Sequence, residues 1–196
     1  MRRDVRCALV RKPTGLLVGG ILLFGTPGLA DARTLHGKVV DGEGHEPLHG
    51  AVVVIVSYRY PFLRATDAAP IFTKAVEALS DAEGDFSIDA SAPWTLGARE
   101  QRLAVFKPGY RPYLRYRSRN DPGALLPNDE VLSLTKARSA REMASVTAGA
   151  TEIRIAGPGE RSPSDVPPDR VPKLMRLVGL QRKLFVAIKR GGAPVR

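Results

Sequence analysis

The residues best suited to chemistry lie in an arginine- and tyrosine-rich stretch at 110–119. It reads Tyr-Arg-Pro-Tyr-Leu-Arg-Tyr-Arg-Ser-Arg, and its candidate ligand-binding residues are Arg111, Tyr113, Arg115, Tyr116, Arg117 and Arg119. Guanidinium groups bind carboxylate or phosphate through paired hydrogen bonds, and tyrosine rings can stack on sugars. At the two-residue period of a strand, the arginines from 115 onward share one face. The stretch predicts either a site for an anionic glycan or lipid head group, or a solvated strand face whose arginines extend into water.

The three histidines, His36, His45 and His49, all fall in or beside one predicted turn. With Glu43 or Glu46 they offer imidazole and carboxylate ligands of the kind that zinc and copper accept. Their spacing matches no compact ligand pattern, and a polar turn on a solvated edge explains them better. We therefore predict no metal site.

Other polar groups do not combine into a catalytic set. The acidic turn at 81–85 lacks the full pattern of a loop that supplies about six to eight oxygen ligands to calcium, so its carboxylates are interpreted as turn caps. Ser162, Ser164 and Asp165 lie in a proline-rich linker and form no credible triad with the histidines. The sequence predicts no catalytic residue and no cofactor.

Residues 1–32 have the pattern of a secretory signal peptide. Basic residues precede an uncharged apolar run at 15–25, and Ala30-Asp-Ala32 follows as a small-residue cleavage site. An uncleaved membrane anchor is the alternative, but the run is shorter than the roughly 20 apolar residues that span a bilayer. Cleavage near Ala32 would remove Cys7, the only cysteine. We therefore expect a periplasmic or secreted protein without disulfides.

The positive charge is concentrated at the C-terminal end. The full chain carries +10, from 30 basic and 20 acidic residues. Residues 33–169 hold 17 basic and 18 acidic groups, a net of −1, whereas residues 170–196 hold eight basic groups and no acid, a net of +8. A near-neutral main domain behind a secretion signal argues against nucleic acid as a partner.

From residue 34 onward, short β-prone runs alternate with glycine-bearing turns. The expected strands cover 34–40, 51–58, 76–80, 86–88, 102–106, 110–119 and 131–134. The β-branched run 51–58 predicts a core strand buried on both faces. The turns at 41–44 and 81–85 predict two strand–turn–strand reversals, and 59–74 predicts a long connection. Strands at this spacing favour an all-β sandwich.

Three sequence blocks together resemble a known family. They are Gly37-Lys-Val-Val-Asp-Gly with Pro47-Leu-His-Gly-Ala-Val, then Ser80-Asp-Ala-Glu-Gly-Asp-Phe-Ser-Ile, then Val105-Phe-Lys-Pro-Gly-Tyr. Over residues 33–135 the chain resembles the carboxypeptidase regulatory-like domain, a transthyretin-like (prealbumin-like) β-sandwich. The resemblance implies a seven-stranded Greek-key sandwich that serves as an accessory module, without a reaction of its own.

The residues after 135 predict an extension of the sandwich. Residues 136–170 predict a weakly structured linker, because their second half is rich in Gly, Pro, Ser and Asp. Over 171–190, apolar residues recur at helical spacing after Pro172, which predicts an amphipathic basic helix. Gln181 interrupts its apolar stripe. The stripe either docks on the sandwich or makes a peripheral contact with an anionic membrane.

Two functions from different classes follow from these patterns. The first is a secreted or periplasmic, non-catalytic β-sandwich that binds a protein or an anionic glycan or lipid of the cell envelope. The alternative is a transthyretin-fold enzyme, a hydrolase or carbohydrate-active protein, that uses the arginine–tyrosine strand. The enzyme requires Arg111, Arg115 and Arg117 to converge with a histidine on one concave site, whereas a dispersed arrangement argues against it.

Overall fold

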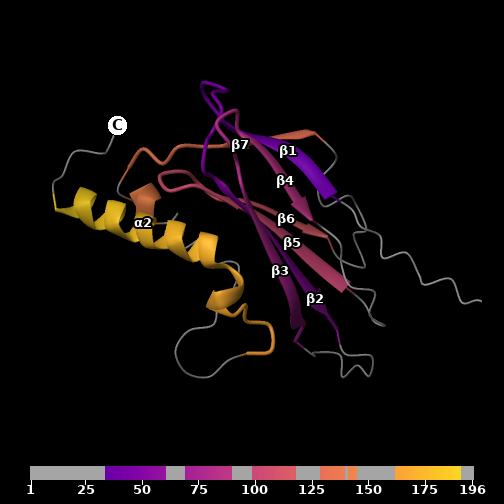
Figure 1. Cartoon of the computed structure of the whole chain (residues 1–196). Coiled ribbons are helices and arrows are strands. Elements are labelled where there is room, and N and C mark those ends of the chain that lie inside the picture. The colour runs from indigo at the N-terminus through magenta and orange to yellow at the C-terminus, as the bar shows by residue number, and fades with distance from the viewer. Residues whose placement is uncertain are drawn as a thin grey trace, which may run out of the picture.

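A computed structural model describes residues 34–60, 69–89, 99–117, 129–139, 141–144 and 162–190. Within these residues, seven strands form two packed sheets, and a long C-terminal helix lies beside them (Figure 1). The predicted fold class, an all-β sandwich of seven strands with a C-terminal helical extension, is confirmed. The predicted signal peptide at 1–32 lies outside the described residues.

The sheets contain three and four strands. The smaller has the order β4-β1-β7, made of Asp85–Asp89, Thr34–Asp41 and Glu130–Leu134. The larger has the order β3-β2-β5-β6, made of Ile71–Leu79, Val52–Arg59, Arg99–Phe106 and Tyr113–Arg117. All neighbours pair antiparallel except β1 and β7, which are parallel.

Strand β2 is the centre of the molecule, as its β-branched sequence predicts. Residues Val52 to Tyr58 are all buried. Val53 and Ile55 face the core between the two sheets, whereas Val54 and Val56 face a second core on the other side of the larger sheet. A strand that is apolar on both faces therefore has an apolar layer against each face.

The two turn blocks form as predicted, but they are not hairpins. Strands β1 and β2 belong to different sheets, and so do β3 and β4. In the second turn, Asp81 Oδ1 accepts the N–H groups of Glu83 and Asp85 at 3.1 and 2.8 Å. Gly84 has φ +80°, and a Cβ there would lie 2.5 Å from the Val39 carbonyl oxygen. The turn thus packs against β1, so the chain crosses between the sheets instead of folding back beside its own strand.

The predicted long connection at 59–74 is shorter than expected. Strand β2 continues to Arg59, and β3 already begins at Ile71. Phe72 pairs opposite Tyr58, with the two rings edge to face at 6.4 Å. The sequence did not predict that β3 begins at Ile71, because Pro70 precedes it and its residues do not alternate in polarity. An edge strand that is half-buried on both faces shows no clear two-residue period.

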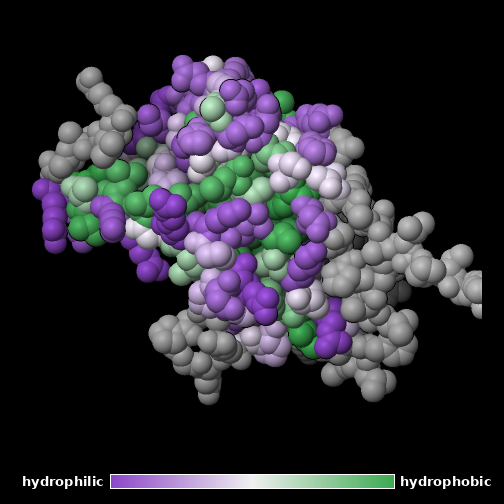
Figure 2. Space-filling model, in the orientation of Figure 1, coloured by the Kyte–Doolittle hydropathy of each residue, from purple (hydrophilic) through white to green (hydrophobic). Residues whose placement is uncertain are grey.

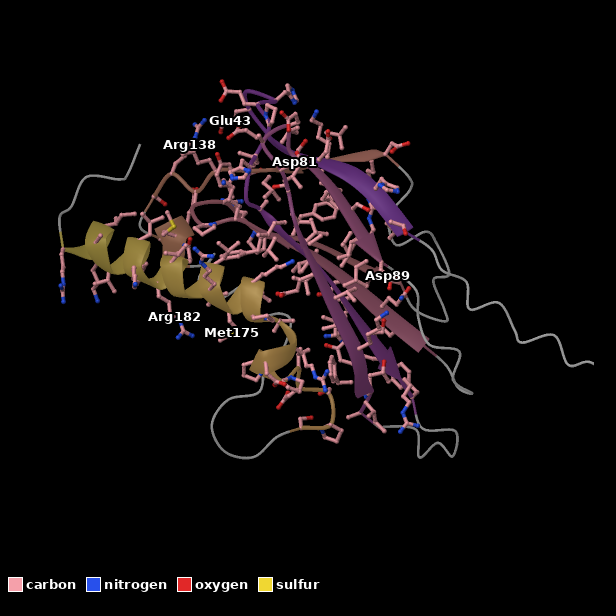
Figure 3. The ribbon with its side chains drawn as sticks, viewed as in Figure 1. Glu43, Asp81, Asp89, Arg138, Met175 and Arg182 are labelled. Atoms are coloured by element: carbon pink, nitrogen blue, oxygen red, sulfur yellow. The ribbon has the colours of Figure 1, made fainter. Side chains whose placement is uncertain are left out.

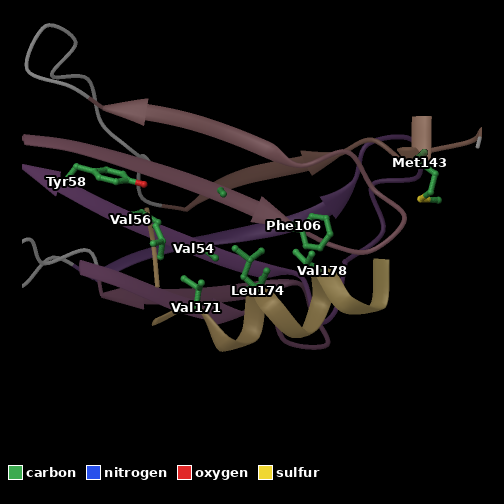
Figure 4. Packing of buried hydrophobic residues seen from close by; sticks show 12 residues of the cluster. Val54, Val56, Tyr58, Phe106, Met143, Val171, Leu174 and Val178 are labelled. Carbon is green, nitrogen blue, oxygen red and sulfur yellow. The ribbon is translucent and has the colours of Figure 1, made fainter. Parts of the chain in front are cut away.

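The C-terminal helix, α2 (Pro172–Lys189), docks on the outer face of the larger sheet. Leu174 and Val178 pack there against β2 and β5 side chains such as Val54 and Phe106 (Figure 4). Of the two alternatives for the apolar stripe, docking on the sandwich is the one observed. The described parts of the predicted linker join this layer, since Ala137, Met143 and Val166 are buried in it.

Polar groups on other elements hold α2 in place. The helix has no capping side chain of its own at Val171, and the Glu77 carboxylate of β3 accepts the N–H groups of Lys173 and Leu174 at 2.9 and 2.8 Å. Gln181, which interrupts the stripe, is fully buried. Its side chain accepts the Gly109 N–H at 2.8 Å and donates to the Met143 sulfur at 2.7 Å. The interruption is therefore a specific polar anchor.

Candidate functional site

The described members of the predicted arginine–tyrosine set do not share one face. In β6, Tyr113 packs against the core between the sheets, whereas Leu114 packs against the layer under α2. Because side chains alternate along a strand, Arg115 lies on the face of Tyr113, and Tyr116 lies on the face of Leu114. Arg119 lies outside the described residues, and so does the side chain of Arg117.

Arg115 is held in an ion pair between the sheets. Its two terminal nitrogens donate to the Glu130 carboxylate of β7 at 2.6 and 2.7 Å, in a bidentate arrangement. Its guanidinium also lies 5.5 Å from the centre of the Tyr113 ring. The hydrogen bonds to Glu130 raise the pKa of Arg115. This arginine closes the edge of the sandwich and does not present a free charge.

Arg111 also has a carboxylate partner, because its guanidinium lies 3.2 Å from Glu142. Among the described residues, Arg111, Arg115 and Tyr116 therefore point to different partners, and no histidine joins them. Arg111 and Arg115 therefore do not converge on one site, and the enzyme alternative, which also involves the undescribed side chain of Arg117, stays a prediction.

The structure adds a cluster that the sequence did not indicate, around Arg102 on the outer face of the larger sheet. Its guanidinium lies 4.7 Å from the centre of the Tyr58 ring and 5.6 Å from that of Tyr116. Glu100 accepts from Arg102 Nε and from the Tyr60 hydroxyl, each at 2.6 Å. Burial by itself lowers the pKa of Arg102, but the hydrogen bond and charge of Glu100 outweigh it, so the pKa is raised. This charge, too, is neutralised within the fold.

The histidines and acidic turns do not come together as ligands. His36 lies on the exposed face of β1, and His45 and His49 lie in the exposed β1–β2 connection. In the part of the chain that the structure describes, no three His, Cys, Asp or Glu side chains are grouped to hold a metal ion.

A hollow of about 410 Å³ lies on the outer side of the smaller sheet. Its walls include His36, Lys38, Asp85, Asp129 and Val131. Lys38 and Asp85 form an ion pair across it at 3.6 Å. The hollow therefore offers neither a concentrated charge nor an evident nucleophile.

Ion pairing is frequent throughout the sandwich and its flanking segments. Six cationic side chains there lie within 4 Å of a carboxylate: Lys38, Lys74, Arg102, Arg111, Arg115 and Arg138. Arg138 and Glu43, for example, meet at the end of the sandwich in Figure 3, 2.5 Å apart. Six of the ten cations whose side chains are described in this region thus have a carboxylate partner, whereas Arg59, Lys107, Lys136 and Arg141 have none within 4 Å among the described residues.

Helix α2 is different, because it contains no acidic residue. Its exposed cations, with the Arg190 that ends it, are Lys173, Arg176, Arg182, Lys183, Lys189 and Arg190. Within the described residues, the last five form no ion pair or hydrogen bond through their side chains. In Figure 3, Arg182 points away from the strands. The helix therefore presents a concentrated and uncompensated positive charge.

Apolar side chains accompany these cations. Leu180 and Val186 are 45% and 43% exposed, among the most exposed large apolar residues in the described chain. Figure 2 shows hydrophobic and hydrophilic side chains side by side over the length of α2. No helix in the described residues is long and apolar enough to cross a membrane.

Comparison with known proteins gives a likeness of fold. No protein-family model matches the chain, and no curated protein is significantly similar to it. Among solved structures it is similar to 5-hydroxyisourate hydrolase of Klebsiella pneumoniae, with 12% identity over 54% of this chain and 93% of that one, and a TM-score of 0.31. These values describe a distant match to a transthyretin-like β-sandwich.

Two other structures give similar values. For 3-chlorocatechol 1,2-dioxygenase from Rhodococcus opacus 1CP the identity is 16% over 56% of this chain, the TM-score is 0.32, and the chain spans 62% of that enzyme. For an alternative pilotin from the type II secretion system of Vibrio cholerae the identity is 13% over 55% of this chain and 98% of that one, with a TM-score of 0.27. At these identities and TM-scores the likeness carries no argument about activity.

Proposed function

We propose that this protein is a secreted or periplasmic, non-catalytic binding module that attaches to an anionic component of the cell envelope. In this proposal the signal peptide is removed near Ala32, and the sandwich serves as the scaffold. The outward face of α2 is the attachment surface. The resemblance of residues 33–135 to the carboxypeptidase regulatory-like domain supports an accessory role.

One observation carries the proposal: within the described residues, five of the six cations of α2 and its C-cap form no ion pair or side-chain hydrogen bond, whereas six of the ten described cations in and beside the sandwich have carboxylate partners. A cluster of exposed, uncompensated cations attracts an anionic partner over about 8–10 Å at physiological salt. In the described part of the chain, the charged side chains of Arg176, Lys183 and Arg190 contact no acid, so substituting them breaks no observed ion pair. For this reason we assign the binding surface to α2 in preference to the arginine–tyrosine strand.

Residues 33–196 are the appropriate material for the test, because every buried residue of the described core lies from Leu35 onward. This chain is mixed with bacterial envelope fragments and sedimented at low and high salt. We expect it to sediment with the fragments at low salt and to be released at high salt. A variant with Arg176→Gln, Lys183→Gln and Arg190→Gln should remain in solution. Sedimentation of this variant at the wild-type level would contradict the proposal.

A further inference from the structure

We infer that the anionic partner of α2 is the surface of a phospholipid bilayer, on which the helix lies with its outward face. This inference rests on the proposed function and names its partner. The outward face is defined by Arg176, Leu180, Lys183, Val186 and Arg190. The helix remains docked on the sandwich through its opposite face, so attachment requires no unfolding of the described structure.

The spacing along α2 defines which residues face outward. Leu174, Val178 and Gln181 are buried against the sandwich. Arg176, Lys183 and Arg190 are seven residues apart, which is nearly two turns, so they lie along one side of the helix. All three are exposed, opposite the buried residues. This side therefore forms a basic ridge parallel to the helix axis.

Leu180 and Val186 lie on the two flanks of this basic ridge. Both are exposed apolar side chains on a surface that is otherwise charged, so burying them in a lipid interface is favourable. The long stems of arginine and lysine let their charged ends reach the head groups while the neighbouring apolar groups sit deeper. A basic ridge with apolar flanks suits the boundary between head groups and acyl chains.

The way the cations are held favours a bilayer over an acidic protein. A specific protein interface must order long side chains at a cost of about 0.5–1.5 kcal/mol each, unless neighbouring groups already fix them, as Glu130 fixes Arg115 in β6. Arg176, Lys183 and Arg190 have no such partners among the described residues. Unrestrained cations suit a diffuse layer of mobile anionic head groups, because no fixed geometry is needed there.

The sandwich provides a matched control for the apolar flanks. Leu79 on β3 and Val131 on β7 are 46% and 56% exposed, close to or above the exposure of Leu180 and Val186. The same pair of substitutions can therefore be made on the sandwich and on the helix. Circular dichroism and thermal unfolding check that each variant retains the fold.

The test is vesicle flotation of residues 33–196 with phosphatidylcholine vesicles and with vesicles that also contain phosphatidylglycerol. We expect flotation with the anionic vesicles alone. The helix variant Leu180→Gln/Val186→Thr should lose roughly 10-fold in partitioning, since two apolar contacts with the interface are removed. The sandwich variant Leu79→Gln/Val131→Thr should partition within about twofold of the wild type.

Several results would overturn the bilayer inference. One is equal loss of flotation in the helix and sandwich variants. Another is loss of binding when soluble glycerol phosphate is added and the salt is lowered to keep the total ionic strength constant. This result would indicate a pocket for one head group. A third is absence of flotation with anionic vesicles. If the chain still sediments with envelope fragments in a salt-dependent way, the third result leaves the proposed function intact and points to an acidic protein or glycan. If it does not, both proposals fail.

Discussion

The sandwich and helix α2 differ in how their cations are paired: six of the ten described cations in and beside the sandwich have carboxylate partners, and α2 contains no acid. In the sandwich, arginines meet carboxylates from distant parts of the chain, as Arg115 meets Glu130 and Arg138 meets Glu43. In α2 no acid is present, and the outward cations have no partner among the described residues. Paired charges on the sandwich contribute to its structure, whereas the unpaired charges of α2 are available to another molecule. The comparison predicts that substitutions in the two regions affect different properties.

The largest effect on stability is expected in the core between the sheets. Phe86 is 5% exposed, and its ring lies against Gly37, where an added Cβ would be 2.7 Å from the Phe86 ring. Phe86→Ala should lower the free energy of unfolding by about 3–5 kcal/mol, because it leaves a cavity. Urea denaturation measures this change. Ser87→Ala, on the exposed face of the same strand, should change the free energy of unfolding by less than about 0.5 kcal/mol. An equally small change for Phe86→Ala would show that Phe86 is not part of a packed core.

A smaller loss should follow when the Arg115–Glu130 pair is broken. The two side chains are only 30% and 23% exposed, so Glu130→Gln leaves a partly desolvated guanidinium without its counter-charge. We expect a loss of about 2 kcal/mol in unfolding free energy. Glu43→Gln is the matched control, since the Arg138–Glu43 pair is 70% and 49% exposed. Its cost should stay below about 0.5 kcal/mol. Equal costs for the two substitutions would show that burial does not distinguish these pairs.

A substitution at the junction of β3 and α2 should lower the free energy of helix docking by about 1 kcal/mol. Glu77→Gln removes the negative charge that caps the N-terminus of α2, so the helix loses both a charge-assisted hydrogen bond and a favourable interaction with its dipole. Hydrogen exchange of the first-turn amides measures local opening of the helix. Faster exchange is expected there than for Glu83→Gln, which alters an exposed turn acid. Unchanged exchange at Lys173 and Leu174 would contradict the capping role.

A pH-dependent effect on stability is expected from Tyr110 in the sandwich. Burial, followed by the hydrogen bond to Asp41, raises the pKa of Tyr110 from 10.0 to about 12. Above pH 10 the unfolded chain loses this proton while the folded chain keeps it. The stability that Tyr110 contributes is therefore complete below pH 10 and is lost as the pH rises toward 12. The difference in unfolding free energy between wild type and Tyr110→Phe should narrow over this range, and a constant difference would rule out the raised pKa.

The sequence predicted the strands and the helix well, because these depend on local patterns. The β-branched run at 51–58, the glycine turns and the apolar spacing at 174–188 all lie within short windows. The division of charge between residues 33–169 and 170–196 was also evident from counting. Each of these predictions needs only neighbours along the chain.

Contacts between residues that are far apart in the sequence could not be predicted from local patterns. The sequence left two alternatives for the arginine strand, an anion site or a solvated face, because nothing local indicates that Glu130 pairs with Arg115. Glu77 is 96 residues from the amide of Lys173 that it caps, so the cap was also missed. Gln181 was interpreted as an interruption, because its partners at Gly109 and Met143 come from other elements. Only the packed structure separates neutralised cations from available ones.

We expect the position of a cation, and not the net charge of the protein, to determine binding. This expectation is tested by comparing two triple variants of residues 33–196 that lose the same three charges. One carries Arg176→Gln, Lys183→Gln and Arg190→Gln on α2. The other carries Lys38→Gln, Lys74→Gln and Arg138→Gln on the sandwich.

The measurement is the partition coefficient of each variant on vesicles that contain phosphatidylglycerol, at one fixed salt concentration. We expect a roughly 100-fold loss for the helix variant, because each cation near an anionic surface contributes about 1 kcal/mol. We expect less than about a threefold loss for the sandwich variant, because those cations lie away from the binding face. Equal losses in the two variants, or a larger loss in the sandwich variant, would show that the position of the cations on α2 does not determine binding.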